Sequence, residues 1–210
     1  AYVQRVVNKF LDNGQGVRGD LAHVFSAILM DDEARGPAGL TDTEFGKLRE
    51  PMVRMVQWVR TFGVKSASGA WKISDMSDAG SRLSQSPLRS PSVFNFFRPG
   101  YVAPGTTLST GKVAPEFQLV NESSVGGYLN YMYTTITSGL GDNRADIKAA
   151  YTAEITLANT PGALVQRMNL LLCAGQLSSA TVSLIANAVA TMPGVVTSTT
   201  TTATNMRNRV

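Results

Sequence analysis

The residue types that most often carry nucleophilic, acid–base or metal chemistry are scarce: His23 and Cys173 each occur once. His23 lies off the apolar stripe of Leu21, Val24 and Ile28, which predicts a partly exposed residue on a helix surface and not a catalytic base. Cys173 follows three leucines and is predicted to be a small buried apolar residue. One His and one Cys argue against a zinc site, so no metal and no cofactor is predicted.

Acid–base chemistry between two carboxylates needs both acids in one cleft, and Glu50 and Glu116 are the only such pair nominated. Arginines near both would keep these carboxylates ionised. Two interpretations stay open: the charged residues form ion pairs that fasten a loop, or one of the two glutamates is an acid–base group. The predicted binding or loop-fastening residues are Arg49, Arg89, Phe94, Asn95, Phe97 and Arg98.

Residues 14–19 match the form G-x-G-x-x-G, which binds dinucleotides when a strand precedes it and a helix follows. An amphipathic helix pattern precedes it here, so a glycine-rich turn between two helices is predicted. Basic residues are spread around the helices with few aromatics between them, which favours a solvated surface over a nucleic-acid interface.

The elements that would position these residues are helices. Apolar residues recur at helical spacing over 3–11, from 20 onward, over 51–62, and after Thr160 and Ser178. A further helical stretch begins at Pro115, with an interruption predicted at Gly126-Gly127. Alternating strand patterns do not recur. The prediction is an all-α, irregular multi-helix bundle of about seven to nine helices with almost no strand.

Residues 64–111 lack helical periodicity and contain several prolines among aromatic residues. Proline restricts the backbone and lowers the entropy lost on ordering. We therefore expect a long ordered Pro/Phe-rich loop, held to the helices by buried rings. Phe94 and Phe97 are predicted to be largely buried.

The chain has 210 residues, a net charge of +4 and 16% charged residues, which excludes a charged disordered tail. No apolar run approaches the roughly 18 residues that cross a bilayer, so no membrane span is predicted. Residues 1–210 are expected to form a single helical domain. A helical pattern that starts at the first residue, and another that begins near Asn205, predict the C-terminal fragment of a longer chain.

Four blocks of this sequence resemble the bacterial family known as domain of unknown function 1800. The longest covers residues 86–101 (SPLRSPSVFNFFRPGY), and the others are 16–21 (GVRGDL), 47–51 (KLREP) and 113–118 (VAPEFQ). The blocks keep the family's order and span about half of the chain. The resemblance implies a mostly helical, longer protein that frequently carries an export signal. It supplies no established activity and no catalytic residue.

Two functions are therefore expected as alternatives. The first is a non-catalytic structural or binding module of an exported bacterial protein, found in the periplasm, on the cell surface or outside the cell. Its partners would be the remainder of its own longer chain and a partner protein or surface polymer, without nucleic acid. The second is part of a hydrolase whose catalytic or metal-binding residues lie in a missing N-terminal half.

Overall fold

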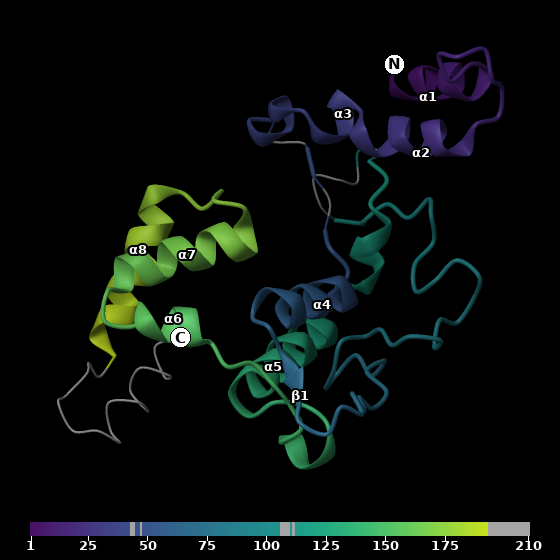
Figure 1. Ribbon diagram of the computed structural model, residues 1–210. Helices are drawn as coiled ribbons and strands as arrows, with labels where there is room; N and C mark the ends of the chain where they lie inside the picture. The colour runs from purple at the N-terminus through teal and green to yellow at the C-terminus, as the bar shows by residue number, and fades with distance from the viewer. Residues whose placement is uncertain (43–44, 47, 106–109, 111, 193–210) are drawn as a thin grey trace. The chain divides into compact units, whose positions relative to one another are not determined.

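The structure is mostly helical, and the chain begins with two short antiparallel helices joined by a turn. The computed structural model describes residues 1–42, 45–46, 48–105, 110 and 112–192, and the backbone alone at Asp142. The chain divides into two compact units, Ala1–Leu48 and Arg49–Val210. The described residues contain eight α-helices and one two-stranded sheet (Figure 1).

The first unit contains α1 (Tyr2–Leu11), α2 (Leu21–Met30), α3 (Asp32–Arg35) and the 3₁₀ turn η1 (Pro37–Leu40). The Asp20 side chain caps α2 by accepting from the backbone N–H groups of Ala22 and His23. Asp12 accepts from the amides of Gly14 and Gly16 at 2.8 and 2.9 Å. Both glycines have positive φ, as a tight turn requires. The G-x-G-x-x-G segment is therefore a turn between two helices, as predicted.

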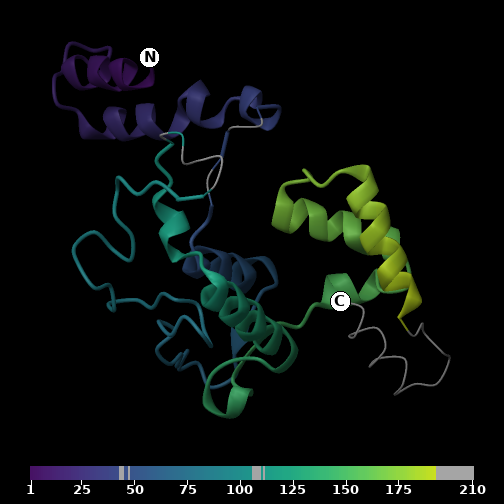
Figure 2. The ribbon, with the colours of Figure 1, turned by 180° about the vertical axis from the view of Figure 1, so that it is seen from behind.

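The second unit contains the other helices. They are α4 (Pro51–Thr61), α5 (Glu122–Ser138), α6 (Thr152–Thr156), α7 (Pro161–Cys173) and α8 (Ser179–Thr191), with 3₁₀ turns η3 (Pro115–Leu119) and η4 (Asp142–Arg144). Pro51 and Pro161 occupy the first turns of α4 and α7, where a missing N–H costs nothing. Ser178 caps α8 by accepting from the Thr181 amide. Figures 1 and 2 show α4 beside α5, and α7 beside α8.

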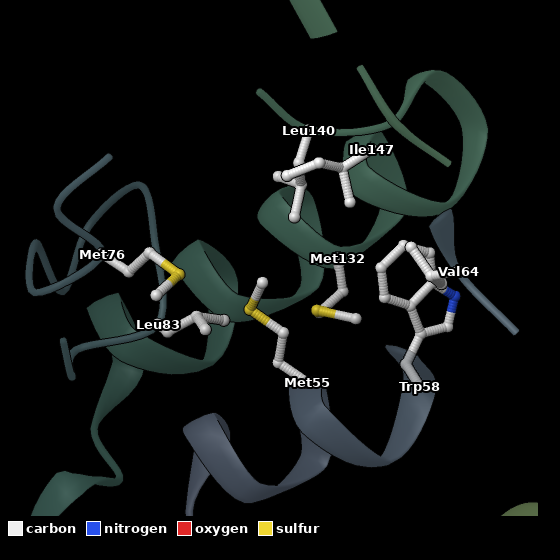
Figure 3. Packing of buried hydrophobic residues seen from close by; sticks show 8 residues of the cluster. All are labelled: Met55, Trp58, Val64, Met76, Leu83, Met132, Leu140 and Ile147. Atoms are coloured by element: carbon white, nitrogen blue, oxygen red, sulfur yellow. The ribbon is translucent and has the colours of Figure 1, made fainter. Parts of the chain in front are cut away.

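The core of the second unit forms between α4 and α5. Its buried residues are Met55, Trp58, Val64, Met76, Leu83, Met132, Leu140 and Ile147 (Figure 3). Met55 and Trp58 come from α4 and meet Met132 of α5, while Met76 and Leu83 come from the long loop. Leu83 and Ile147 are completely buried. The core therefore includes residues of the irregular segment and not helices alone.

The sheet pairs β1 (Lys65–Ser66) with β2 (Ile147–Lys148) in antiparallel register, with Ser66 opposite Ile147. Asp146 strengthens this junction, because its carboxylate accepts from the Ser68 amide and the Ser66 hydroxyl at 2.7 Å each. These hydrogen bonds to the charged form lower the pKa of Asp146. The sheet ties the end of the α4 region to the chain that follows α5.

Buried polar contacts join α6 to its neighbours. The Trp58 indole N–H donates to the Tyr151 hydroxyl at 2.7 Å, and Tyr151 also packs against the ring of Phe62. Burial raises the pKa of Tyr151. Glu154 of α6 is almost fully buried and accepts from Arg167 Nε of α7 at 2.7 Å. A buried carboxylate needs such a partner, so the ion pair fixes α6 against α7.

The predicted interruption of a helix at Gly126-Gly127 is wrong, and the packing of Gly127 explains why. Gly126-Gly127 do not interrupt a helix, because α5 continues through them. Gly127 is buried, and a Cβ at this position would overlap the carbonyl oxygen of Ala79. The loop backbone around Ala79 and Gly80 therefore contacts α5 directly, which only glycine allows. The sequence pattern identified the right residues but assigned them the wrong role.

The fold class is all-α, as predicted, and in the part of the chain that the structure describes, strand is limited to the short two-stranded sheet. Among the described residues, no helix combines the length and the apolar character that crossing a membrane requires. The predicted helix near Asn205 lies outside the described residues. The single domain over 1–210 stays a prediction.

Candidate functional site

Glu50 is the centre of the polar contacts that hold the Pro/Phe-rich segment, defined here as residues 86–101. It precedes Pro51 at the start of α4. Its Oε2 accepts from Gln85 Nε2 at 2.6 Å and from Asn95 Nδ2 at 3.3 Å. Gln85 is only 2% exposed, and its Oε1 accepts from the Met52 amide at 3.3 Å. One carboxylate therefore fastens two loop positions to the first turn of α4.

Glu116 is not part of this arrangement. It lies half-buried in the first turn of η3. Within the described residues, the side-chain contacts of Glu50 are the two amides of Gln85 and Asn95. The structure therefore does not bring the two nominated carboxylates into contact, and Glu50 is engaged as a hydrogen-bond acceptor for the loop.

Arg49 fastens a different pair of elements. Its guanidinium contacts the Gln57 side chain, and its Nη2 donates to the Leu172 carbonyl at 3.2 Å. Gln57 donates to the neighbouring Leu171 carbonyl at 3.0 Å. These carbonyls belong to the last turn of α7, where backbone acceptors lack helical partners and positive charge is favoured. Arg49 therefore joins α4 to the end of α7, and no carboxylate of the described residues pairs with it.

Arg89 and Arg98 hold the segment in two further ways. Arg89 Nη1 lies 3.7 Å from Asp75 Oδ2, and both side chains are substantially exposed. The pKa of Asp75 is lowered chiefly by hydrogen bonds from Ser77, with a smaller contribution from Arg89. The backbone N–H of Arg98 donates to Oε1 of Gln118, a residue of η3, at 2.8 Å. Arg89 thus forms an exposed ion pair and Arg98 a backbone hydrogen bond, and the loop-fastening role of both residues stays a prediction.

The prediction that Phe94 is buried is wrong, because this ring is 59% exposed. Phe97 is half-buried, so its burial is smaller than predicted. A tight turn causes the difference: the Asn95 amide donates to the Ser92 carbonyl at 3.2 Å, and Asn95 has a φ of 66°. Val93 and Phe94 occupy the tip of this turn. Polar groups anchor the segment, in which the Phe94 ring is exposed and the Phe97 ring is half-buried.

Three exposed apolar side chains of the segment, which we call the apolar tip, lie in two turns: Leu88 in residues 86–89, and Val93 and Phe94 in residues 92–95. Leu88 and Val93 are fully exposed, and Leu88 adopts a φ of 60°. Positive φ is costly for a residue with a branched side chain and persists only where surrounding contacts impose it. The hydrogen bond from the Arg89 amide to the Ser86 carbonyl, at 3.2 Å, closes the turn around Leu88. Local structure therefore holds apolar side chains in solvent on a fixed backbone.

Sequence reasoning missed the most important fastening residue, Gln85. It stands between two serines in an irregular stretch, and nothing in its spacing marks it as buried. Asn95 was expected to bind or fasten, and it does contact Glu50. Cys173 was predicted to be buried, but it is exposed near the end of α7.

His23 belongs to a small hydrogen-bonded cluster in the first unit, together with Asp20 and Asn13. Its Nδ1 lies 2.8 Å from Asp20 Oδ2, and Asn13 donates to the same oxygen at 2.8 Å. These hydrogen bonds lower the pKa of Asp20, with Asn13 as the main cause. The His23 side chain is 44% exposed, as expected for a helix-surface position. The described residues contain no cluster of three or more His, Cys, Asp or Glu that could hold a metal ion.

A groove of about 580 Å³ lies between α1 and α2, with His23 on its wall. Arg5 lines this groove and donates two hydrogen bonds of 2.6 Å to Asp31 and one of 3.0 Å to Glu33. Arg5 lowers the pKa of Asp31 to about 2. Arg5 and Asp31 on this wall thus pair with each other.

Comparison with known proteins identifies the family. The match to the family described as "Protein of unknown function (DUF1800)" extends over residues 1–207, so the chain belongs to this family. No curated protein and no solved structure matches the sequence. The resemblance inferred from the four sequence blocks is confirmed.

Proposed function

We propose that this chain is a non-catalytic binding module of an exported bacterial protein, and that the Pro/Phe-rich segment forms its contact surface for a partner protein. The observation that carries the proposal is the apolar tip: Leu88, Val93 and Phe94 are exposed on a segment whose base is fastened to α4. Exposed apolar side chains held on an ordered loop are typical of interaction sites. A pre-ordered loop also loses little entropy on binding.

The contacts of Glu50 support a non-catalytic role. A general acid or base needs an accessible carboxyl group within reach of a substrate atom, with a nucleophile or a second acid nearby. Glu50 instead uses one oxygen to hold two amide groups of its own loop. Export rests on the family resemblance, and the remainder of a longer chain would be a further partner of the module.

A protein partner is favoured over a surface polymer because two of the three tip residues are aliphatic. Leu88 and Val93 carry no polar group and offer no flat ring on which a sugar could stack. Burying such side chains yields hydrophobic free energy only against another apolar surface.

Co-sedimentation with the envelope fraction of a bacterium that carries this gene tests the proposal. The 210-residue chain should sediment with the fraction, and protease treatment of the fraction beforehand should abolish this binding. Phe94→Glu should weaken it at least tenfold. The matched control is Phe25→Glu, which changes an equally exposed phenylalanine (61% against 59%) in the other unit and should leave binding unchanged.

Binding that survives protease treatment would identify a polymer instead, and equal binding by both variants would overturn the proposed surface. A parallel screen against ester, phosphate and glycoside substrates, with and without divalent metal, tests the hydrolase alternative. We expect no turnover by this chain. Turnover that disappears in Glu50→Gln or Glu116→Gln would establish an enzyme. Detection of the full-length protein in periplasmic or extracellular fractions tests export.

A further inference from the structure

The Pro/Phe-rich segment carries positive charge and no negative charge. Residues 86–101 contain Arg89 and Arg98 but no Asp or Glu. The same sign extends over the second unit, because residues 49–210 contain fourteen Lys and Arg against eight Asp and Glu, a net charge of +6. Surfaces that associate specifically carry complementary charges. The charge of the segment therefore constrains the partner that the apolar tip contacts.

The side chain of Arg98 is not used by its own loop. The backbone N–H of this residue donates to Gln118 Oε1 at 2.8 Å, which holds the main chain in place. In the described part of residues 49–210, the exposed guanidinium makes no hydrogen bond and no ion pair. A guanidinium presents five N–H donors in a planar fork that matches a carboxylate in bidentate geometry. Arg98 therefore offers unused donors from a fixed backbone.

Arg89 has a partner that it can exchange. Its Nη1 lies 3.7 Å from Asp75 Oδ2, and the two side chains are 62% and 42% exposed. An ion pair between exposed side chains contributes at most about 1 kcal/mol. The Arg89 guanidinium can therefore leave Asp75 for a carboxylate of a partner at little cost.

Both arginines are close in the chain to the residues of the apolar tip. Arg98 follows Phe94 by four residues, and Arg89 precedes Val93 by the same number. Four residues span at most about 14 Å, well inside the roughly 30 Å width of an interface that buries about 800 Å² per partner. A partner that covers Phe94 therefore also meets both arginines. A wholly apolar partner face would leave two positive charges desolvated and unpaired, which is unfavourable.

We propose that the partner protein presents an apolar patch flanked by Asp or Glu side chains, and that Arg98 and Arg89 bind these carboxylates while the apolar tip enters the patch. This inference rests on the proposed function, because it specifies the protein that the same segment contacts. Arg98 supplies the stronger contact, since its fork is unused, and Arg89 the weaker one, since it first leaves Asp75. The paired charges also fix the orientation of the partner on the segment.

Co-sedimentation of neutral arginine variants with the envelope fraction tests the inference. Arg98→Gln should weaken binding about tenfold and Arg89→Gln about threefold. The matched control, Arg60→Gln, removes an exposed charge from α4 and should leave binding unchanged. Raising the salt concentration from about 50 to 500 mM should weaken binding of the wild type but have little effect on the double variant, because salt screens these contacts. Far-UV circular dichroism confirms that each variant is folded.

Carbodiimide coupling tests directly whether a carboxylate lies at position 98. The reagent activates a carboxyl group and joins it to an adjacent amine as an amide. Arg98→Lys should therefore become linked through position 98 to an Asp or Glu of an envelope protein, as mass spectrometry of the linked peptides would show. Arg60→Lys is the matched control and should give no link through position 60.

The outcomes separate this inference from the function on which it rests. Phe94→Ser removes an exposed ring without adding a charge and should weaken binding on its own. If Phe94→Ser weakens binding while the arginine variants, the salt series and the coupling have no effect, the inference is wrong and the contact surface stands. An equal loss in Arg60→Gln and Arg98→Gln would also overturn the inference, because net charge alone would then explain the attraction. If the wild type does not bind, or binds equally after protease treatment of the fraction, both proposals fail.

Discussion

Replacing Gln85 with methionine removes the main fastening of the Pro/Phe-rich segment without changing side-chain length. Gln85 donates to Glu50 at 2.6 Å and accepts from the Met52 amide at 3.3 Å. A hydrogen bond to a charged group contributes about 1.5–3 kcal/mol, and a long neutral one about 0.5 kcal/mol. The apolar replacement recovers part of this by avoiding the burial of an amide. We expect Gln85→Met to lower the free energy of unfolding by about 2 kcal/mol.

Guanidinium denaturation followed by tryptophan fluorescence measures this effect. The buried Trp58, 4% exposed, reports on the core of the same unit. Gln176→Met is the matched control, because Gln176 is exposed. The free energy of unfolding of this variant should stay within about 0.5 kcal/mol of the wild-type value. If Gln85→Met unfolds within that same range of the wild type, the polar contacts do not hold the segment and the reasoning is wrong.

Three further predictions concern a pair of leucines, a pair of glycines and the carboxylate of Asp31. Leu83→Ala should cost about 2–5 kcal/mol, whereas Leu88→Ala in the same irregular region should change the free energy of unfolding by less than about 0.5 kcal/mol, since Leu83 is completely buried and Leu88 fully exposed. Gly126→Ala should stabilise by about 0.5–1 kcal/mol through helix propensity, but Gly127→Ala should destabilise by about 1–3 kcal/mol because its Cβ would overlap the Ala79 carbonyl; calorimetry on the two variants decides this, and equal melting temperatures would contradict it. The pKa of Asp31 is lowered from 3.8 to about 2 in the folded state, so its stabilising pair with Arg5 is fully present above pH 4 and is lost as the pH falls from about 4 to 2. Thermal melts of wild type and Asp31→Asn should therefore converge over that window, and a constant difference would count against the pair.

The helices could largely be predicted from the sequence, because their signals are local. Asp20, Pro51 and Ser178 mark helix starts by capping or by proline, and the structure uses each as expected. α6 was missed because it has only five residues and is held by the buried pair of Glu154 and Arg167. Such a pair depends on tertiary contact and leaves no periodic signal.

The candidate site was only partly predictable for the same physical reason. The family blocks contain both Glu50 and Asn95, which the structure joins by a hydrogen bond, but hydrophobicity alone suggested that Phe94 would be an anchor. A tight turn with positive φ at Asn95 reverses this, and the anchor is the amide of Gln85. Turn geometry and long-range hydrogen bonds decide which side of a loop faces the protein, and residue type alone predicts neither of them.

Photo-crosslinking from position 93 shows whether the apolar tip contacts a protein partner. Val93 is fully exposed, so a benzophenone side chain there should not disturb the fold. Ser183, exposed on α8, provides the control position. Position 93 should give a discrete protein adduct in envelope fractions, which should be lost in Gln85→Met and absent from position 183. No adduct from position 93, or the same adduct from both positions, would contradict it.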